Sequence, residues 1–447
     1  MILSALFGIA WLQQESISKR VNPNPTGANG YEEYLYAADI VDSQAYKDFE
    51  EWDAYRQAAR KGTPWTRVDE NEKPVPPPRA PGRLSVESTN LEVKKAKVKA
   101  FNRIFDLVQA GNTKEVHDPH IEWDLETLFP QYAGFKGVAK FLTMGAYVSF
   151  AEGRTSEGTE RLLTALTFAM KFADGPLICE LVSIACQAIA LAEFEVHLRS
   201  LSELDCQRVI RFMRATLKQP SNAVRTFKSE RQGIEASMVK ALSTPASVTT
   251  FFGQDADDAF TKVLGSMSTN ELTQVRERVT QAIETHFAKL IDVASGPESG
   301  WVKPISGPSA PDPNSVEKWT PELVGDSLAA ALMPVFGQAM QAEAKNRTQL
   351  RLLLLHALVL EYRWQEGALP TKLSDAVAGS EIIDPISGKE FKYELQGRNG
   401  YRLYSEGFSE IGEIELRYRK APGGPDSPLR EDGDNPPPLF SLKTNRR

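Results

Sequence analysis

Cysteine and histidine are scarce in this chain, which has three cysteines and five histidines among its 447 residues. Cys179, Cys186 and Cys206 form neither an even-numbered disulfide set nor a Cys-x-x-Cys pair for zinc. All three lie in apolar helical patterns, so we expect small buried side chains without a redox or nucleophilic role. The nucleophile elbow Gly-x-Ser-x-Gly is also absent. These shortages disfavour an enzyme and predict a protein without a cofactor.

The sequence also lacks an excess of positive charge. Its 52 basic residues are outnumbered by 59 acidic residues, which gives a net charge of −7. A protein that binds nucleic acid through a broad positive field needs the opposite balance, so we expect no nucleic-acid partner. The phosphate-binding pattern Gly-x-x-x-x-Gly-Lys-Ser is missing, and Asn29-Gly30 is only a weak turn motif.

Long hydrophobic runs are rare. The apolar run at residues 2–12 is shorter than the roughly 20 residues of a transmembrane helix. It suits the core of a signal peptide, although no Lys or Arg precedes it and no Ala-x-Ala site follows. We expect residues 1–20 to be an export signal or membrane anchor, with a packed helix as the alternative. This favours a cell-envelope location, with the cytoplasm as the alternative, and we expect no other segment to span a bilayer.

Two proline-rich stretches, at residues 73–82 and 296–321, divide the chain. A single hydrophobic core stops growing at roughly 250–300 residues, so two or three units are expected. The stretches favour extended backbone and are typical of linkers or wrapping loops, and the Pro-, Gly- and Asp-rich tail is typical of disorder. The predicted units are an apolar segment 1–20, a helical arm with linker 21–83, an all-α domain 84–295, a linker 296–320, an α+β module 321–420 and a tail 421–447.

Apolar residues recur at helical spacing between the two linkers. The stripes with one predicted buried face each begin at Phe135, Ile178, Val224 and Leu272. Ser202-Glu203-Leu204-Asp205 fits a helix capping box, and the whole predicts packed helices joined by short turns. Small and large residues from 146 to 166 are weakly similar to one tetratricopeptide hairpin. A generic helical hairpin is the main interpretation, because a repeat array needs about three units.

The region 350–407 has the most specific order of parts. An apolar helix is expected to end at Gly367 and Pro370, because glycine accepts the left-handed conformation of a helix end and proline prevents continuation. Turn residues and alternating aromatic residues follow, which predicts a long helix packed on about three antiparallel strands. The motif residues after the helix are Asp384, Pro385, Gly388, Tyr393, Gly400, Tyr401, Tyr404 and Gly407. The predicted fold class is therefore mainly α, with a multi-helix body and a small α+β module.

This order of parts resembles the globular domain of the major pseudopilins of type II secretion, over residues 351–407, about an eighth of the chain. The resemblance implies a helix on an antiparallel sheet. That family binds calcium in an aspartate-rich loop, whereas the corresponding loop here, 408–415, has three glutamates and no aspartate. A calcium site is therefore the minor interpretation, and Asp384 is expected to form a turn.

The same helix departs from the pseudopilin pattern in a second way. It is internal and carries Arg347, Arg351 and His356, so we expect no packing into a filament. As a whole, the chain resembles bacterial envelope proteins that have a helical body followed by a pseudopilin-like end.

Residues 117–124 hold the densest set of metal-ligand types in the chain. His117, His120, Glu122 and Asp124 carry the nitrogen and oxygen atoms that suit zinc, iron or manganese. Pro119 prevents a regular helix that presents both histidines on one face, and no His-Glu-x-x-His motif occurs elsewhere. A polar loop is the main interpretation and a metal site the weaker one.

Three glutamates interrupt apolar helical patterns: Glu180, Glu193 and Glu195. The spacing of Glu193 and His197 does not match the Glu-x-x-His motif of two-metal helical bundles. We expect polar contacts between helices or solvated positions, and a buried Glu180 would need a partner such as an arginine.

Together these features predict a non-enzymatic scaffold that binds other proteins, with membrane association through residues 2–12. The alternative is an enzyme with an acidic, metal-dependent site in the helical domain.

Overall fold

The computed structural model describes residues 27–68, 72–118, 123, 127–252, 259–303, 305, 319–332, 334–397, 400–408 and 412–417. Helices make up most of the fold, and a small three-stranded antiparallel sheet lies near the C-terminus. This confirms the predicted fold class. The predicted segments 1–20 and 421–447 lie outside the described residues, as does most of the second linker.

The elements follow one another in a simple order. The first helices are α2 (Tyr31–Asp42), α3 (Gln44–Arg60), α4 (Asn90–Ala100), α5 (Arg103–Asn112), α6 (Gln131–Ala151), α7 (Thr155–Lys171), α8 (Leu177–His197), η2 (Leu198–Ser200) and α9 (Glu203–Leu217). Next come α10 (Ala223–Ala241), α11 (Pro245–Phe252), α12 (Ala259–Ser266), α13 (Thr269–Ser295), η3 (Glu298–Gly300), α14 (Pro321–Leu332) and α15 (Pro334–Glu366). The last are α16 (Leu373–Ala376), η5 (Gly379–Ile382), β1 (Lys392–Leu395), β2 (Tyr401–Phe408) and β3 (Gly412–Glu415).

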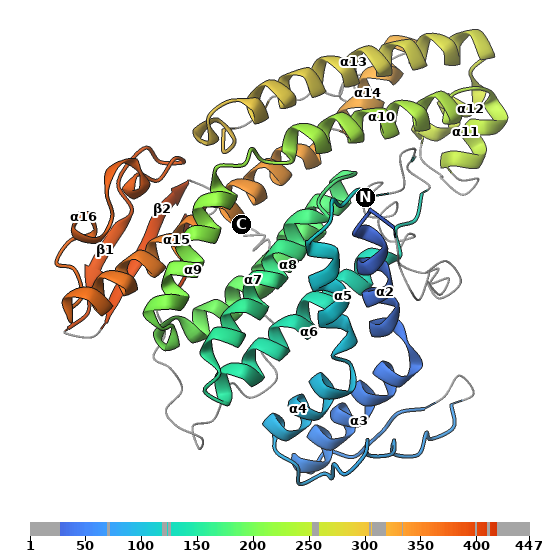
Figure 1. Ribbon diagram of the computed structural model, residues 1–447. Helices are drawn as coiled ribbons and strands as arrows, with labels where there is room; N and C mark the ends of the chain where they lie inside the picture. The colour runs from blue at the N-terminus through green and yellow to red at the C-terminus, as the bar shows by residue number, and fades with distance from the viewer. Residues whose placement is uncertain are drawn as a thin grey trace.

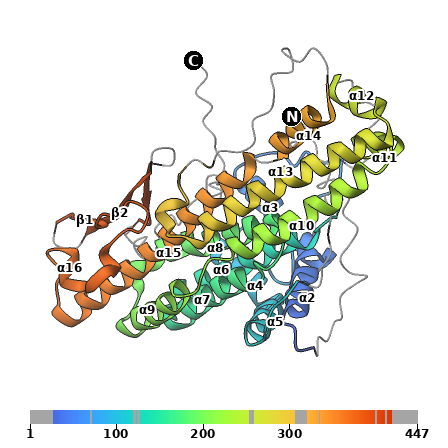
Figure 2. The same ribbon diagram turned by 90° about the horizontal axis from the view of Figure 1, so that it is seen from above.

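The helices enclose two large hydrophobic cores (Figure 1). The first core joins α2, α5 to α9, the second half of α15 and the sheet. The second core joins α10 to α14 and the first half of α15. A small third cluster, around Phe49, Trp52 and Val93, packs α3 against α4. Figures 1 and 2 place the sheet at one end of the molecule and α11 and α12 at the other.

Helix α15 is the element that both cores share. Its residues 336–344 belong to the second core and its residues 350–360 to the first. A helix of 33 residues spans about 50 Å, which is long enough to enter both. The helix ends where predicted, because Gly367 has a φ of +71°. The predicted domain boundaries at 295 and 320 stay predictions, whereas the cores themselves extend across them.

The predicted buried faces differ in accuracy. Those of α6 and α13 are fully buried, and the predicted capping box at Ser202 and Asp205 is confirmed. The face predicted for α8 is wrong: among its residues only Val182 is buried, while its other members, Ile178, Leu181, Ala185, Ala188 and Ala192, are half-buried. Because α6, α7 and α15 all pack on α8, its apolar residues are distributed around the helix and no single face stands out.

The sheet confirms the predicted strand pairing. The strand order is β1-β2-β3, with Tyr393 opposite Leu403 and Ser405 opposite Ile414, and α15 covers one face of the sheet. A β-bulge follows Ser405, and Gly407 there has a φ of +69°. A Cβ at Gly407 would collide with the backbone of Gly412, so only glycine fits.

Two of the predicted units, whose boundaries stay predictions, contact the cores. In the arm at 21–83, Tyr31 and Tyr34 of α2 are buried in the first core. The start of the linker at 296–320 is also packed, since Trp301 is buried in the second core and Glu298 forms ion pairs with α15. Proline content predicts extended backbone, but it gives no information about which neighbouring side chains are buried.

By length and composition alone, two helical stretches of the described chain could cross a membrane, Leu177–Ser200 and Pro321–Glu366. The expectation of no span beyond residues 2–12 is therefore wrong by this criterion. Of the apolar window in each, 56% and 50% is buried inside the fold. Core helices of soluble proteins meet the same criterion, so these helices do not assign a location.

Candidate functional site

The stretch 117–124, predicted as the densest set of metal ligands, is described only in part. His117 is exposed, and its Nδ1 lies 3.1 Å from Oδ2 of Asp174. His120, Glu122 and Asp124 lie outside the described residues. Within the part of the chain that the structure describes, no three His, Cys, Asp or Glu side chains converge as a metal site would require.

Asp118, next to His117, connects two helices. Its Oδ2 accepts hydrogen bonds from the hydroxyl groups of Tyr31 on α2, at 2.9 Å, and Tyr132 on α6, at 3.1 Å. Burial raises the pKa of both tyrosines, and the charge of Asp118 adds to the effect. Both tyrosines therefore stay protonated and donate to the carboxylate, which fixes the loop to the first core.

The weak turn motif Asn29-Gly30 has a role that the sequence analysis missed. The side chain of Asn29 donates to the carbonyl of His117 at 2.7 Å and accepts from its backbone N–H at 3.0 Å. Gly30 lies so close to Gly111 that a Cβ would come within 2.4 Å of its carbonyl oxygen. Close backbone approach, rather than phosphate binding, explains this glycine.

A buried polar seam runs between α8 and α15. Glu180, Ser183 and Gln187 lie along α8, and Glu343 and Asn346 along α15. Asn346 Nδ2 donates to Gln187 Oε1 at 3.0 Å, and Gln187 Nε2 donates to Ser183 Oγ at 3.0 Å. Gln187 and Asn346 make this contact between the two helices, and Glu180 is buried in the same seam. Of the other two predicted glutamates, Glu193 makes a local contact, 2.9 Å from His197 Nε2, and Glu195 accepts from the backbone N–H of Arg417, after the last strand.

Two carboxyl groups in this seam, those of Glu180 and Glu343, have raised pKa values. Burial raises the pKa of Glu180 far above its ordinary value, and the nearby Glu343 raises it further, while Arg225 and Arg347 oppose the shift. Burial also raises the pKa of Glu343, against the opposing charge of Arg347. Glu180 Oε2 is buried and has no hydrogen-bond partner among the described residues.

Next to the seam, Glu298 of η3 holds two arginines of α15. Its Oε1 lies 2.8 Å from Arg347 Nε, and its Oε2 lies 2.7 Å from Arg351 Nη1. Arg347 also donates to the carbonyls of Leu217 and Gln219, in the connection between α9 and α10. Burial alone would raise the pKa of Glu298, but the bonds and charges of both arginines hold it below its usual value.

Arg347 and Arg351 stand out in the sequence as charges on an apolar helix, whereas their partner Glu298 lies in a stretch with the composition of a linker. Glu343 and Asn346 were not among the predicted site residues. Their spacing along α15 was the available indication, since polar residues at intervals of three or four on an apolar helix share one face.

The predicted C-terminal motif residues make structural contacts. Asp384 is buried, and its carboxylate accepts from Ser405 Oγ at 2.7 Å and from the backbone N–H of Ile386 at 3.1 Å. The hydroxyl group of Tyr393 donates to the carbonyl of Pro370 at 2.9 Å. Asp384 thus has the geometry of a turn-forming residue.

In the loop compared with the calcium site, Arg402 interacts with two of the three glutamates. Its Nη2 lies 2.8 Å from Glu413 and 3.3 Å from Glu415, and Glu410 lies outside the described residues. This ion pairing neutralises carboxylates that a calcium ion would otherwise use.

The three cysteines are free and buried, in agreement with their predicted packing role. Burial raises the pKa of Cys186 and of Cys206 to about 12, and that of Cys179 further. A thiol that stays protonated at neutral pH is a poor nucleophile and a poor metal ligand.

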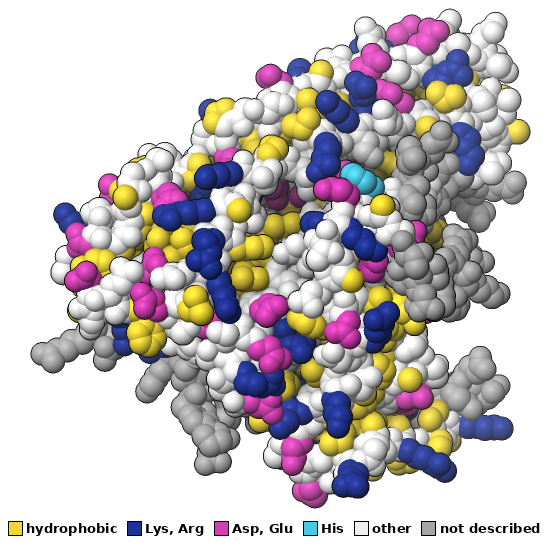
Figure 3. All heavy atoms as spheres, in the orientation of Figure 1, with side chains coloured by type: hydrophobic (Ala, Val, Ile, Leu, Met, Phe, Trp, Pro, Cys, Tyr) yellow, Lys and Arg dark blue, Asp and Glu magenta, His cyan; other side chains and the backbone are white. Residues whose placement is uncertain are grey.

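A surface groove of about 620 Å³ lies between α5 and α9, with α7 between them as its floor. Leu163 of α7 and Phe212 of α9 supply half-buried apolar surface. Arg208 and Arg211 form a basic wall on α9, and Figure 3 shows Lys and Arg side chains along this helix beside hydrophobic ones. The remaining lining residues are Gln109, Asn112, Thr113, Glu160, Thr164 and Thr167.

The two sides of the groove differ in how their side chains are held, by hydrogen bonds on the α5 side and by weaker contacts on the basic α9 side. Asn112 is fixed from both sides, because it accepts from the Tyr34 hydroxyl at 2.5 Å and donates to the carbonyl of Thr164 at 3.1 Å. Arg208 lies 3.6 Å from Asp205, which is longer than a strong ion pair. Arg211 is exposed and forms no ion pair within the described part of the chain.

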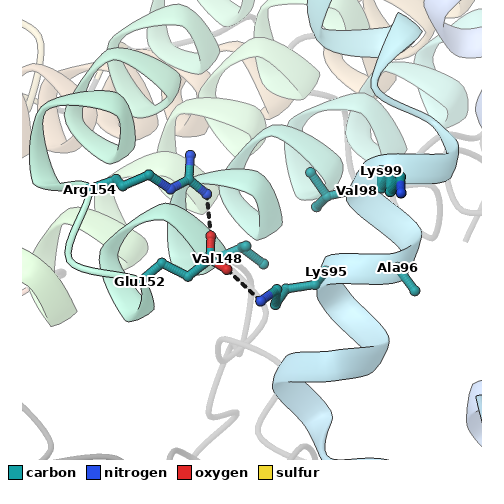
Figure 4. Close-up of a pocket in the computed structure, with 7 residues that line it drawn as sticks. All are labelled: Lys95, Ala96, Val98, Lys99, Val148, Glu152 and Arg154. Atoms are coloured by element: carbon teal, nitrogen blue, oxygen red, sulfur yellow. Dashed lines mark hydrogen bonds and ion pairs between the residues drawn. The ribbon is translucent and has the colours of Figure 1, made fainter.

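A second hollow, of about 310 Å³, lies between α4 and the end of α6 (Figure 4). Lys95, at 2.5 Å, and Arg154 bind Glu152 from two sides, and their charges are thereby compensated. Lys99 is the remaining cation of its lining, and the hollow has about half the volume of the groove over α7, which is therefore the better candidate site.

Comparison with family models, with curated proteins and with solved structures finds no match to this chain. The resemblances to pseudopilins and to a tetratricopeptide hairpin therefore stay predictions. The helical body itself is a property of the structure.

Proposed function

We propose that this protein is a non-enzymatic scaffold that binds an acidic segment of a partner protein in the groove between α5 and α9. The supporting observation is the lining of the groove, in which the apolar side chains Leu163 of α7 and Phe212 of α9 lie beside the basic side chains Arg208 and Arg211, and Glu160 is the one acidic residue of the lining. Complementary charge selects partners and orients them, while burial of apolar side chains supplies affinity.

The shape of the groove favours a peptide over a small molecule. Small-molecule sites enclose most of their ligand, whereas this groove is lined in part by exposed residues, including Gln109, Thr113 and Arg211. Its floor helix, α7, has 17 residues and spans roughly 25 Å. A peptide that lays apolar side chains on Leu163 and Phe212 can keep its carboxylates beside the arginines.

Peptide selection tests this function directly. A random peptide library displayed on phage and selected against the full chain is expected to yield peptides that combine Asp or Glu with Leu or Phe. The double variant Arg208→Glu/Arg211→Glu is expected to weaken the selected peptides about tenfold or more, because it replaces attraction with repulsion. Fluorescence anisotropy of labelled peptides measures the affinity.

The matched control makes the same charge change away from the groove, at Arg276 and Lys289 of α13. The Arg276→Glu/Lys289→Glu variant should bind the selected peptides as the unmodified protein does. Equal weakening by both double variants, or selection of neutral and basic peptides, would contradict the proposal.

The envelope location rests on residues outside the described ranges, as does most of the predicted metal-ligand set of the enzyme alternative, and each has its own test. Fractionation of cells decides whether the protein is exported, anchored or cytoplasmic. Metal analysis of the purified protein, with His117→Ala as the comparison, tests the metal-dependent alternative; stoichiometric zinc, iron or manganese lost in the variant would favour it.

A further inference from the structure

Two places where the chain passes between the two cores, the α9–α10 connection and the middle of α15, meet at one buried polar cluster beside the turn η3. The α9–α10 connection contributes Ser221, which donates to Glu343 at 2.9 Å. The turn η3 contributes Glu298, and the middle of α15 contributes Arg347. Helix α8 reaches the same place with Glu180, just after Leu177, which belongs to the second core. The cluster therefore lies at the junction of the cores, between residues 344 and 350 of α15 where one core gives way to the other.

The charges at this junction do not balance. Three buried or nearly buried carboxyl groups, Glu180, Glu298 and Glu343, face two guanidinium groups, Arg347 and Arg351. Both guanidinium groups are bound to Glu298, which leaves Glu180 and Glu343 without a dedicated cation. Arg225 of α10 faces the cluster, but its Nη1 lies 3.2 Å from Asp174.

The hydrogen bonds of Glu343 and Glu180 also show that the negative charge at the junction is not fully compensated. Both oxygens of Glu343 accept bonds, from Ser221 Oγ and, at 3.5 Å, from Asn346 Nδ2. The buried Oε2 of Glu180 has no donor within the described residues. An ionised carboxylate in that position would be both desolvated and next to a second negative charge, which costs several kcal/mol. One proton supplies both the missing donor and the missing positive charge.

We propose that Glu180 and Glu343 hold one proton between them at neutral pH, and that loss of this proton loosens the junction between the two cores. The pair is a proton-binding site, and its protonation controls how α8 packs on α15.

The direction of the pH effect follows from proton counting. When the junction is open to water, both carboxyl groups have ordinary pKa values and are ionised at neutral pH. The closed junction therefore holds one more proton than the open one, so rising pH favours opening. The opening equilibrium constant should rise about tenfold per pH unit for one released proton, until the closed pair itself ionises. This agrees with the raised pKa of both groups.

Other titratable groups face the cluster and define the control. From α10, Glu230 accepts the backbone N–H of Leu177 at 2.7 Å, and burial raises its pKa to about 7. Asp174 precedes α8, and Glu298 stays ionised between its two arginines. Glu230 contributes a pH effect of the same sign, so Glu230→Gln must be measured beside the pair.

Hydrogen exchange of the full chain, corrected for intrinsic exchange rates, measures the opening of α8 and of the middle of α15 from about pH 6 to about pH 9. The unmodified protein should show opening that increases with pH. Glu180→Gln and Glu343→Gln should each reduce the pH dependence of the opening constant by the same amount. The double variant should reduce it no further, because the two groups share a single proton. Glu230→Gln should leave the contribution of this pair in place. Absence of a pH dependence in the unmodified protein, or additive effects of Glu180→Gln and Glu343→Gln, would overturn the proposal.

Infrared difference spectroscopy gives a readout that a purely structural role would not change. The carbonyl stretch of one protonated carboxylic acid should be present at neutral pH in Glu230→Gln and absent from the triple variant that adds Glu180→Gln and Glu343→Gln. If Glu230→Gln shows no protonated carboxylic acid at neutral pH, the pair does not hold a proton and the proposal fails, even where a variant is too unstable for hydrogen exchange.

Discussion

Replacing Glu298 with glutamine is expected to lower the free energy of unfolding by about 3 kcal/mol. The glutamate side chain is only 12% exposed and binds two arginines, Arg347 at 2.8 Å and Arg351 at 2.7 Å. Glutamine keeps the size but removes the charge, so two nearly buried guanidinium groups lose their counter-ion. Removing one partner of a buried ion pair costs more than forming the pair contributes, because the remaining charge stays desolvated. Urea unfolding followed by circular dichroism measures the change.

The control uses a pair with the same geometry at the surface. Glu381 binds Arg214 through two bonds of 2.8 Å each, but the two side chains are 30% and 46% exposed. Glu381→Gln should therefore cost about 1 kcal/mol or less, because water and salt screen exposed ion pairs. If both variants lose a similar amount of the free energy of unfolding, burial of the ion pairs of Glu298 adds nothing to stability.

Acidification from pH 7 to pH 4 is expected to reduce stability by about 3 kcal/mol through His356 alone. This side chain is fully buried on α15; its Nδ1 accepts from the Tyr401 hydroxyl at 2.8 Å and its Nε2–H donates to the Leu416 carbonyl at 2.6 Å. A neutral ring satisfies both bonds, and burial lowers the pKa from 6.5 to about 4. Above pH 6.5 the histidine is neutral in both states. Below it only the unfolded chain takes up the proton, at about 1.4 kcal/mol per pH unit.

The His356→Leu variant separates this effect from other acid effects. It should be less stable at pH 7, by about 2 kcal/mol, because the Tyr401 hydroxyl and the Leu416 carbonyl lose their partner. Its further loss between pH 7 and pH 4 should be about 3 kcal/mol smaller than that of the unmodified protein. His286→Gln is the comparison, since burial also lowers the pKa of His286, which lies on α13 beside Phe287 of the second core. An unchanged acid dependence in His356→Leu would contradict the assignment.

The C-terminal unit was predictable because its determinants are local. Gly367 ends the helix through its own φ, and Asp384 forms its turn with the backbone N–H of Ile386, two residues away. Alternation along residues 401–405 directly indicates which side chains face α15. The three buried cysteines and the capping box at Ser202 were predictable for the same reason.

The groove and the polar seam depend on contacts between distant parts of the chain. Arg211 and Gln109 line the same groove although about a hundred positions separate them in the sequence. Glu298 lies in a proline-rich stretch that suggests a linker, and its pairing with Arg351 results from the path of α15. On α8 even the buried face was predicted wrongly, because helices surround it on several sides.

The sequence by itself determined several of the helices, the helix ends at Ser202 and Gly367, the three antiparallel strands and the packing role of the cysteines, since these follow from backbone preferences and short-range periodicity. Only the tertiary structure decided that α15 belongs to two cores and that Glu180 lies near Glu343. It also placed the apolar side chains Leu163 and Phe212 beside the basic side chains of α9 in one groove. Electrostatic energies depend on distance and desolvation, and both are set by packing between residues far apart in the chain.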